Sequence, residues 1–226
     1  SIVVLHACCH NPTGADLSEA QWKEVVGIVR ARGLVAFIDM AYQGFADGIE
    51  PDALALRLFA ASGLQFFVSS SFSKSFSLYG ERVGALSIVT ASRDESARVM
   101  SQVKRVVRTN YSNPPTHGGA VVTAVLASPE LRKLWEEELA GMRERIRAMR
   151  TGLVDKLKAR GVAQDFAFVA RQRGMFSYTG LTAEQVERLK SEFGIYAVST
   201  GRICLAALNT RNLDYVADAI AAVIRK

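Results

Sequence analysis

The chain has 226 residues, of which 49% are hydrophobic and 22% are charged. Such a chain can bury the core of one large domain or of two smaller ones. It has no apolar run of about eighteen residues and no signal-peptide pattern, so we expect neither a membrane span nor a secretory leader. It opens on an apolar run without an initiator Met, and we expect it to be a fragment of a longer protein.

The net charge of +6 does not indicate a nucleic-acid partner, because the basic residues are scattered along the chain. Those between Arg143 and Arg150 alternate with Glu144 and apolar positions, which is typical of a solvated helix face. The three cysteines form no disulfide pattern, so we expect inert thiols in a reducing, cytoplasmic setting. His6 and His10 have no partner at ligand spacing, and we expect no metal site.

In the first part of the chain, short apolar runs alternate with helical patterns. This alternation is typical of an α/β fold, with a mostly parallel sheet between helices in three layers. A capping box at Ser18–Gln21 predicts the start of the first helix, and Gly33 predicts its end. We expect, in chain order, a strand at 2–8, a turn at 10–14, this helix, a strand at 34–38, a helix at 51–61, strands at 64–69 and 82–89, and a helix at 93–107.

The most regular segment begins at Ser128-Pro129, where Ser is a good helix cap and Pro a good first residue. Apolar residues then recur at helical spacing, which predicts a helix at about 129–160, roughly 45–50 Å long, that links two domains. We therefore divide the chain into 1–141, part of a large domain, and 142–226, a smaller α+β domain. In the latter we expect a strand pair near 166–180, a helix from Thr182, strands at 195–198 and 202–206, and a final helix around 213–223.

The stretch from Ser71 to Gly84 places Lys74 among small hydroxyl side chains, directly after an apolar run, with Arg82 further on. A lysine becomes a covalent catalyst when desolvation or a nearby cation lets its amine lose a proton. Hydroxyls together with an arginine are suited to a phosphate group. A reactive amine beside a phosphate receptor is what pyridoxal phosphate requires, since it is an aldehyde with a phosphate tail.

Asp39 directly follows an apolar run that we predict to be a strand. Asp39 and Lys74 then both fall at carboxyl ends of strands, where open α/β sheets bind ligands. A buried carboxylate there needs a cation, and a protonated pyridine nitrogen would be one. In the alternative interpretation, Asp39 caps the following helix. Tyr42 and Asn11 could hydrogen-bond the phenolic oxygen of the same ring, or else be a packing tyrosine and a turn asparagine.

Two arginines further along the chain are candidates for binding an anion. Arg202 lies in an otherwise apolar segment, and a carboxylate gripped by both ends of its guanidinium is the best match. The alternatives are an inter-domain salt bridge and a side chain that reaches out to solvent. Arg108 precedes a turn-rich stretch and either lies on the surface or reaches towards a partner subunit.

Six motifs occur in order along the chain: His10–Gly14, Asp39–Phe45, Ser71–Lys74, Gly80–Gly84, Asn110–Pro115 and Gly174–Ser177. Together they resemble the aspartate and aromatic-amino-acid aminotransferases of bacteria, class I pyridoxal-phosphate enzymes with the aspartate aminotransferase fold. The resemblance covers the whole chain, but only the C-terminal portion of such an enzyme. It implies that 1–141 is the remaining part of the large cofactor-binding domain and that 142–226 is the small domain.

The resemblance implies how the chain would hold pyridoxal phosphate. Lys74 would bind the cofactor as a Schiff base and then carry the proton between substrate and cofactor. Asp39, supported by His6, would pair with the pyridine nitrogen. The remaining contacts would be made to the ring oxygen by Asn11 and Tyr42, and to the phosphate by Ser71, Ser73 and Arg82.

The substrate contacts are likewise implied by the resemblance. Arg202 would bind the α-carboxylate, and Phe176 would line the substrate pocket. Arg108 would bind the distal carboxylate of aspartate or glutamate in the site of the neighbouring subunit, since the resemblance implies a homodimer with shared sites. An aromatic side chain over the ring, part of the phosphate cup and a partner tyrosine come from the N-terminal half in this family, so we expect the 226 residues alone to be poorly active.

The expected function is an aminotransferase of amino-acid metabolism that moves an amino group from an aromatic amino acid or aspartate to 2-oxoglutarate. The segments Ser75–Gly80 and Met175–Leu181 look closer to the aromatic branch of the family. The alternatives are an aspartate-specific aminotransferase and another enzyme of the same fold, such as a β-lyase or decarboxylase. A relative that only binds other proteins would be expected to lose Lys74, Asp39 or Arg82, and all three are present.

Overall fold

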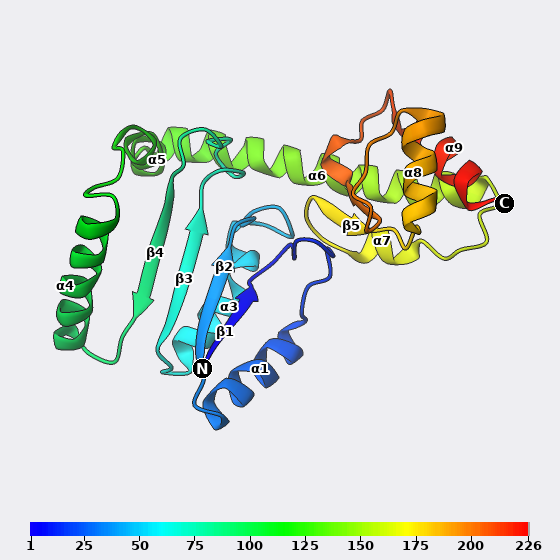
Figure 1. Ribbon diagram of the computed structural model, residues 1–226. Helices are drawn as coiled ribbons and strands as arrows, with labels where there is room; N and C mark the ends of the chain where they lie inside the picture. The colour runs from blue at the N-terminus through cyan, green and yellow to red at the C-terminus, as the bar shows by residue number, and fades with distance from the viewer. Residues whose placement is uncertain (226) are drawn as a thin grey trace. The chain divides into compact units, whose positions relative to one another are not determined.

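The computed structural model describes residues 1–225 (Figure 1). The chain forms two compact units, one of residues 1–8 and 17–139 and one of residues 9–16 and from Ala140 onward. The elements are, in chain order, β1 Ile2–His6, α1 Glu19–Ala31, β2 Val35–Met40, α2 Ile49–Asp52, α3 Leu54–Ala61, β3 Phe66–Ser71, β4 Gly84–Val89, α4 Arg93–Asn110, α5 His117–Ala127, α6 Pro129–Ala159, α7 Ala167–Arg171, β5 Phe176–Tyr178, α8 Ala183–Phe193, β6 Arg202–Cys204, the 3₁₀ turn η1 Leu205–Ala207 and α9 Leu213–Ile224.

The first unit contains a four-stranded sheet in the order β1-β2-β3-β4 (Figure 1). Strands β1, β2 and β3 are parallel, whereas β4 runs antiparallel to β3. The fold is therefore α/β with a mixed sheet. A register of His6 opposite Asp39, and of Asp39 opposite Ser69, brings the carboxyl ends of the three parallel strands together.

One face of this sheet is covered by α1 and α3, and the core of the unit lies there. Trp22 from α1 meets Phe59 from α3 edge to face, with ring centroids 6.5 Å apart, and Phe59 lies 5.5 Å from Phe66 of β3. The predicted capping box of α1 is confirmed, because Ser18 accepts a hydrogen bond from the Gln21 amide while the Gln21 side chain accepts one from the Ser18 amide.

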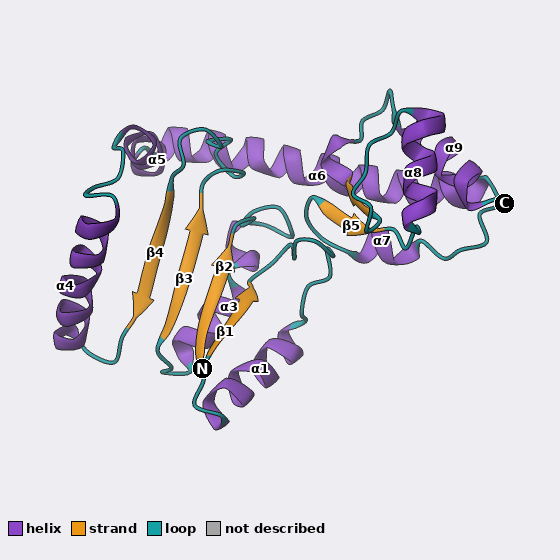
Figure 2. Cartoon of the chain, viewed as in Figure 1, coloured by secondary structure: helices purple, strands orange, loops and turns teal. Residues whose placement is uncertain are grey.

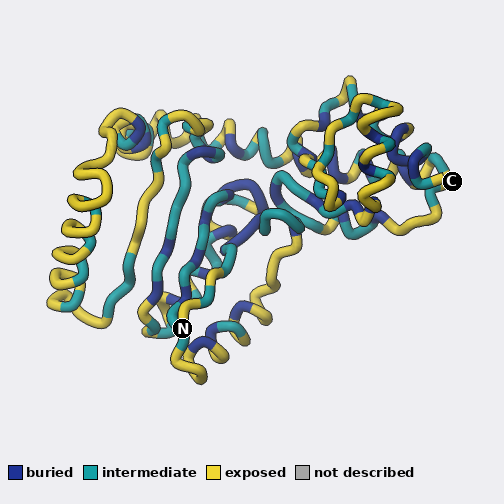
Figure 3. The backbone as a smooth tube through the Cα atoms, viewed as in Figure 1, coloured by how far each residue is buried: buried dark blue, intermediate teal, exposed yellow. Residues whose placement is uncertain are grey.

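The opposite face of the sheet is most exposed on the edge strands β1 and β4 and is partly buried on β2 and β3 (Figure 3). Ile2 and Val4 of β1 are 67% and 63% exposed, and Leu86 of β4 is 55% exposed. Because side chains alternate along a strand, His6 shares this face with Ile2 and Val4. The row of polar residues at the strand ends thus lies on the face that α1 and α3 leave uncovered.

The expectation of a mostly parallel sheet holds for β1, β2 and β3, and only β4, which returns after the turn that follows Lys74, runs antiparallel within the described residues. Two details of the first unit differ from the sequence-based expectation. The helix expected at 51–61 is divided into α2 and α3 at Ala53. Helix α5 was not predicted, because its residues are apolar on all sides and show no helical period.

The second unit combines a two-stranded antiparallel sheet, β5-β6, with α8 and α9 (Figure 2). Helix α6 runs from the first unit into the second, and its residues Leu153 and Leu157 are buried with Leu189 of α8 and Ile220 of α9. Thr182 caps α8 with a capping box, as the sequence predicts, and Gly194 ends it in the left-handed conformation.

Two expectations for this unit are wrong. The strand pair near 166–180 is half helix, because 167–171 form α7, with Phe166 and Val169 buried at helical spacing. Its strand β5 pairs instead with β6, where Tyr178 lies opposite Arg202. Residues 195–198 form no strand. Among residues 1–225, none of the helices has both the length and the apolar character that a membrane span requires.

Candidate functional site

Asp39 is the centre of a polar row at the end of the first unit's sheet. The Ser69 hydroxyl donates a hydrogen bond of 2.9 Å to one Asp39 carboxylate oxygen, and the His6 imidazole lies 3.8 Å from the other. Asp39 lies within β2 and caps no helix, which excludes the alternative that the sequence left open. The carboxylate is one-third exposed and held from both sides, so it presents a fixed negative charge at the strand ends.

Lys74 and Tyr42 lie next to each other in the loops that follow β3 and β2. The Lys74 amine is 4.7 Å from the centroid of the Tyr42 ring, and Tyr42 is 5% exposed. A cation above an aromatic face is attracted by the ring quadrupole, which fixes the amine in one position. Within the described part of the chain, no carboxylate forms an ion pair with Lys74, so its amine is available for chemistry.

The hydroxyls expected to bind phosphate, those of Ser71 and Ser73, directly precede Lys74 in the chain. Ser71, the last residue of β3, accepts a hydrogen bond of 3.3 Å from the Ser73 amide, and Ser73 is buried. Ser71 lies opposite Gly84 in the sheet, which brings the turn before β4 alongside Phe72. Arg82 stands in that turn with a left-handed φ of 51°, and its guanidinium donates to the Tyr79 carbonyl. Such a conformation is uncommon for a residue with a side chain and is often found at functional sites.

Hydrogen bonds hold both the loop that contains Tyr42 and the loop that contains Lys74 in place. Asp52 is buried and accepts hydrogen bonds from the amides of Gly44, Ala46, Asp47 and Gly48, which holds the loop after Tyr42 in place. Burial raises the pKa of Asp52, while these amide donors oppose the increase. The Trp135 indole donates a 2.6 Å hydrogen bond to the Ser75 carbonyl and stacks on Phe76, which fixes the loop directly after Lys74.

In the second unit, three predicted site residues form another group. The Arg202 guanidinium donates a 3.1 Å hydrogen bond to the Asn11 side-chain carbonyl, and it lies 4.8 Å from the centroid of the Phe176 ring. No carboxylate of residues 1–225 pairs with Arg202, so the salt-bridge alternative finds no support there. A half-buried guanidinium oriented by an amide and an aromatic ring can bind an anion with its remaining N–H groups.

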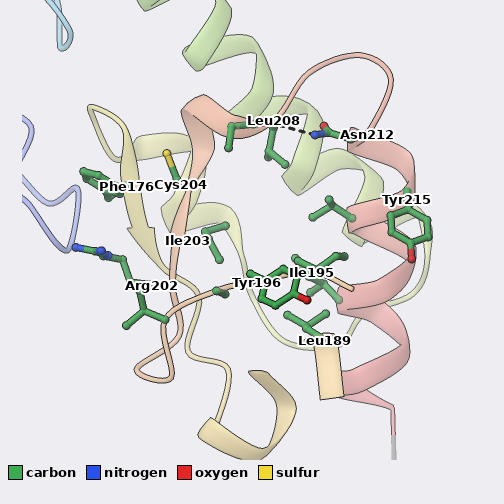
Figure 4. Close-up of a pocket in the computed structure, with 15 residues that line it drawn as sticks. Phe176, Leu189, Ile195, Tyr196, Arg202, Ile203, Cys204, Leu208, Asn212 and Tyr215 are labelled. Atoms are coloured by element: carbon green, nitrogen blue, oxygen red, sulfur yellow. Dashed lines mark hydrogen bonds between the residues drawn. The ribbon is translucent and has the colours of Figure 1, made fainter. Parts of the chain in front are cut away.

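The second unit also contains a mostly apolar cavity of about 560 Å³, lined in part by Leu189, Ile195, Tyr196, Ile203 and Tyr215 (Figure 4). Phe176 and Arg202 belong to its lining, but in Figure 4 the Arg202 side chain extends away from Tyr196 and the apolar side chains. The guanidinium end of Arg202 is therefore directed at the Asn11 turn and not at the cavity.

Among the described residues, no hydrogen bond or ion pair joins Arg108 to the other predicted site residues of the first unit. It is exposed in the last turn of α4 and donates a 2.5 Å hydrogen bond to the Ser112 hydroxyl. The turn-rich segment that follows thereby keeps Arg108 at the surface.

One expectation about the charged residues is wrong. Arg150 was predicted to lie on a solvated helix face, but it is only 2% exposed. The helical spacing already contains the signal, because Arg150 falls on the same stripe as Ile146, Leu153 and Leu157. The sequence-based reasoning also missed Ser69, which gave no signal beyond its place at a strand end.

The comparisons with known proteins cover almost the whole chain. Residues 1–220 match the family model described as aminotransferase class I and II. The curated "Aspartate aminotransferase" of Pseudomonas aeruginosa is 72% identical over 99% of this chain and 56% of its own length. The "Aromatic-amino-acid aminotransferase" of Escherichia coli K12 is 53% identical over the same shares.

A solved structure agrees with these matches. The aromatic-amino-acid aminotransferase from Burkholderia pseudomallei, covalently bound to pyridoxal phosphate, is 73% identical and superposes with a TM-score of 0.98, over 100% of this chain and 56% of that one. The chain thus spans little more than half the length of the relatives it matches. Each match states what share of the relative's length is covered. It does not state which part of the relative that is, so the expected C-terminal position stays a prediction.

Proposed function

Because the chain belongs to the aminotransferase class I and II family, we propose that it forms part of a pyridoxal-phosphate-dependent aminotransferase. The observation that carries this proposal is the position of the Lys74 amine, 4.7 Å from the centre of the Tyr42 ring and without an acidic partner among residues 1–225. An amine held in this way, in the same unit as a fixed carboxylate, is suited to covalent catalysis rather than to a structural ion pair.

The chemical groups that the first unit offers match those that pyridoxal phosphate requires. Lys74 offers an amine for the aldehyde, and Asp39, held by Ser69, offers a negative charge that would keep the pyridine nitrogen protonated. Ser71 and Ser73 offer hydroxyl and amide groups for the phosphate, and the register that pairs Ser71 with Gly84 supports a role for Arg82 beside them. When bound, the cofactor supplies an electron sink for negative charge at the substrate α-carbon.

The residues of the chain would then supply orientation, charge and proton transfer. The Lys74 amine would take a proton from one carbon and return it at another, a role worth about 10²–10⁴ in rate. The Tyr42 hydroxyl and the Asn11 amide would donate hydrogen bonds to the ring oxygen. Arg202, oriented by Asn11 and Phe176, would bind the α-carboxylate of the amino acid.

We propose that the substrates are aromatic amino acids and aspartate, with 2-oxoglutarate as amino acceptor. The names of the relatives support both classes, since the 72% identical one is an aspartate aminotransferase and the 73% identical structure is an aromatic-amino-acid aminotransferase. An aspartate-specific enzyme is the second candidate, and the first of these two relatives favours it.

The organisation of the whole protein is also a proposal. The first unit would belong to the large cofactor-binding domain, α6 would link it to the small domain, and the division would fall near 141/142, close to the boundary between the compact units after Leu139. Exposed Arg108 supports a homodimer in which it serves the neighbouring subunit's site. A reducing, cytoplasmic setting is proposed from the cysteine pattern of the sequence.

The experiment that tests the function is the substitution Lys74→Ala in the complete holoenzyme. We expect the visible absorption band of the lysine-bound cofactor to disappear and turnover to fall by at least about 10²–10⁴, because both the covalent link and the proton carrier are removed. The matched control is Lys23→Ala, which removes an exposed lysine paired with Glu19 and should change neither. Ordinary activity in Lys74→Ala would refute the proposed function.

A second substitution, Arg108→Ala, tests the substrate class. We expect kcat/KM for aspartate to fall roughly 10- to 100-fold, as for the loss of a charge-assisted hydrogen-bonded pair, while the value for phenylalanine changes little. Arg105→Ala, one turn earlier on the same exposed helix, is the control. Equal losses for the two amino acids would show that Arg108 lies outside the substrate site.

A further inference from the structure

Arg150 is a buried cation whose direct hydrogen-bond partners among residues 1–225 are uncharged. It lies in α6 and is 2% exposed, and within the described residues no acidic group forms an ion pair with it. Burial lowers the pKa of Arg150 to about 10, so the guanidinium is still charged at neutral pH. A buried charge is costly unless hydrogen bonds replace its hydration, so its partners require an explanation.

The partners of Arg150 are all in one short segment of the second unit. Its Nη2 donates to the carbonyls of Phe176, Gly174 and Arg173 at 2.6, 2.7 and 3.1 Å. Its Nη1 donates to the Val169 carbonyl at 2.9 Å and to the Ser177 hydroxyl at 3.2 Å, and its Nε to Gly174 at 3.2 Å. A planar fork with five N–H groups thereby fixes the backbone that enters β5, which a lysine could not do.

This segment carries the groups that orient Arg202. The Phe176 ring faces the Arg202 guanidinium, and Tyr178 pairs with Arg202 across β5 and β6. The Arg173 amide donates a 2.8 Å hydrogen bond to the Gly14 carbonyl, which ties the turn containing Asn11 to the same segment. Both contacts of Arg202, the amide and the ring, therefore depend on backbone that Arg150 holds.

We propose that Arg150 is a positioning residue for substrate binding: it holds Phe176 and the Asn11 turn so that Arg202 presents its guanidinium in one orientation. This inference rests on the proposed function, in which Arg202 binds the α-carboxylate. In this proposal, attachment of the cofactor and binding of the substrate carboxylate are carried out by different residues. Lys74 and Asp39 belong to the first unit, whereas the hydrogen-bond partners of Arg150 lie in the second, so we expect the covalent link between Lys74 and the cofactor to form without Arg150.

The test is Arg150→Lys in the complete holoenzyme, with Arg147→Lys as control. Arg147 lies three residues earlier on α6 and is half exposed beside Glu144. Arg150→Lys keeps the charge but loses the fork, so KM for amino-acid substrates should rise about 10- to 100-fold, as a small misplacement of a binding group does. The visible band of the lysine-bound cofactor should still be present, because Lys74 is intact, and Arg147→Lys should match the wild type in both measurements.

A double variant shows whether Arg150 acts through its neighbours. If it does, Arg150→Lys combined with Phe176→Ala raises KM no further than the larger single effect. The inference would be overturned if the KM increases of the two single variants multiply in the double variant. It would also be overturned if KM is unchanged in Arg150→Lys. Where Arg150→Lys yields no folded protein, Ser177→Ala replaces it, and loss of this one acceptor should raise KM roughly fivefold. An unchanged KM there would likewise overturn the inference.

The two proposals fail differently in these measurements. If the wild-type holoenzyme lacks the visible band and does not transfer amino groups, the proposed function is wrong whatever Arg150 does. If the wild type is active and the Arg150 variants have the same KM as the wild type, the proposed function stands and the positioning role is wrong.

Discussion

Two glycines allow the close approach of backbone segments around Asn11. Gly14 has a φ of +72°, and a Cβ there would lie 2.5 Å from the Phe176 carbonyl oxygen. Gly174 has a φ of +78°, and its Cβ would lie 2.5 Å from the Cys9 side chain. Neither a left-handed backbone nor such a distance tolerates a side chain, so both positions require glycine.

Substitution of Gly14 should therefore destabilise the second unit. We expect Gly14→Ala to lower the free energy of unfolding by about 2–5 kcal/mol, from left-handed strain of about 1–2 kcal/mol and from the clash with backbone. Gly161→Ala is the control, since Gly161 has a φ of +68° but nothing within 4 Å of a Cβ. Denaturant unfolding of both variants measures the difference, and equal losses would show that the clash is relieved by movement.

For individual residues, the local sequence predicted which side chains lie at the strand ends better than it predicted which residues they contact. Asp39 lies near the end of the apolar strand β2 and Lys74 comes shortly after β3, so their places at the strand ends were predictable from their neighbours. The hydrogen bond between Arg202 and Asn11 joins residues 191 positions apart, and no local pattern reports such a distance. Arg150 was misassigned because its charge was given more weight than its place on the apolar stripe of the helix.

The C-terminal end of helix α6 is joined to α9 by ion pairs. Arg160, just after α6, donates to Asp218 at 2.6 Å and to Asp214 at 3.3 Å, and Lys156 pairs with Asp214 at 2.6 Å. Hydrogen bonds from Arg160 hold the pKa of Asp218 below its ordinary value, and those from Lys156 do the same for Asp214.

The sign of these shifts gives a pH dependence. A carboxyl with a lowered folded-state pKa stabilises the fold above its ordinary value, near 3.8, and loses that contribution as the pH falls through the lowered value. We expect Asp218→Asn to lower the thermal midpoint slightly at neutral pH, and the difference from wild type to shrink progressively as the pH falls below 3.8 and also in about 1 M NaCl. The control is Asp155→Asn, at an exposed position of α6. A difference that persists at low pH would contradict the ion-pair explanation.

The elements that the sequence predicted well are those with local signals. The caps at Ser18 and Thr182 and the glycine after α8 mark helix ends by short-range hydrogen bonds. The direction of β4 and the partner of β5 depend on where distant chain segments meet, and strand periodicity carries no such information. That is why the antiparallel direction of β4 was not predicted and why 166–180 was taken as a strand pair.

At the scale of the molecule, the candidate residues divide between two compact units. Lys74, Asp39, Tyr42 and the serines lie in the first, whereas Asn11, Phe176 and Arg202 lie in the second. The segment 9–16 belongs to the second unit although it directly follows β1, which no composition change along the chain indicates. This division supports a protein in which cofactor attachment and carboxylate binding can be perturbed separately.

The central claim is that the amine of Lys74, and no other lysine, bonds to pyridoxal phosphate. Reduction of the complete holoenzyme with borohydride, followed by proteolysis and mass spectrometry, tests it most directly, because reduction makes the link to the lysine permanent. We predict that the added pyridoxyl-phosphate mass appears on the peptide containing Ser73-Lys74-Ser75. Finding that mass on a different lysine, or on none while amino-group transfer proceeds, would contradict the account.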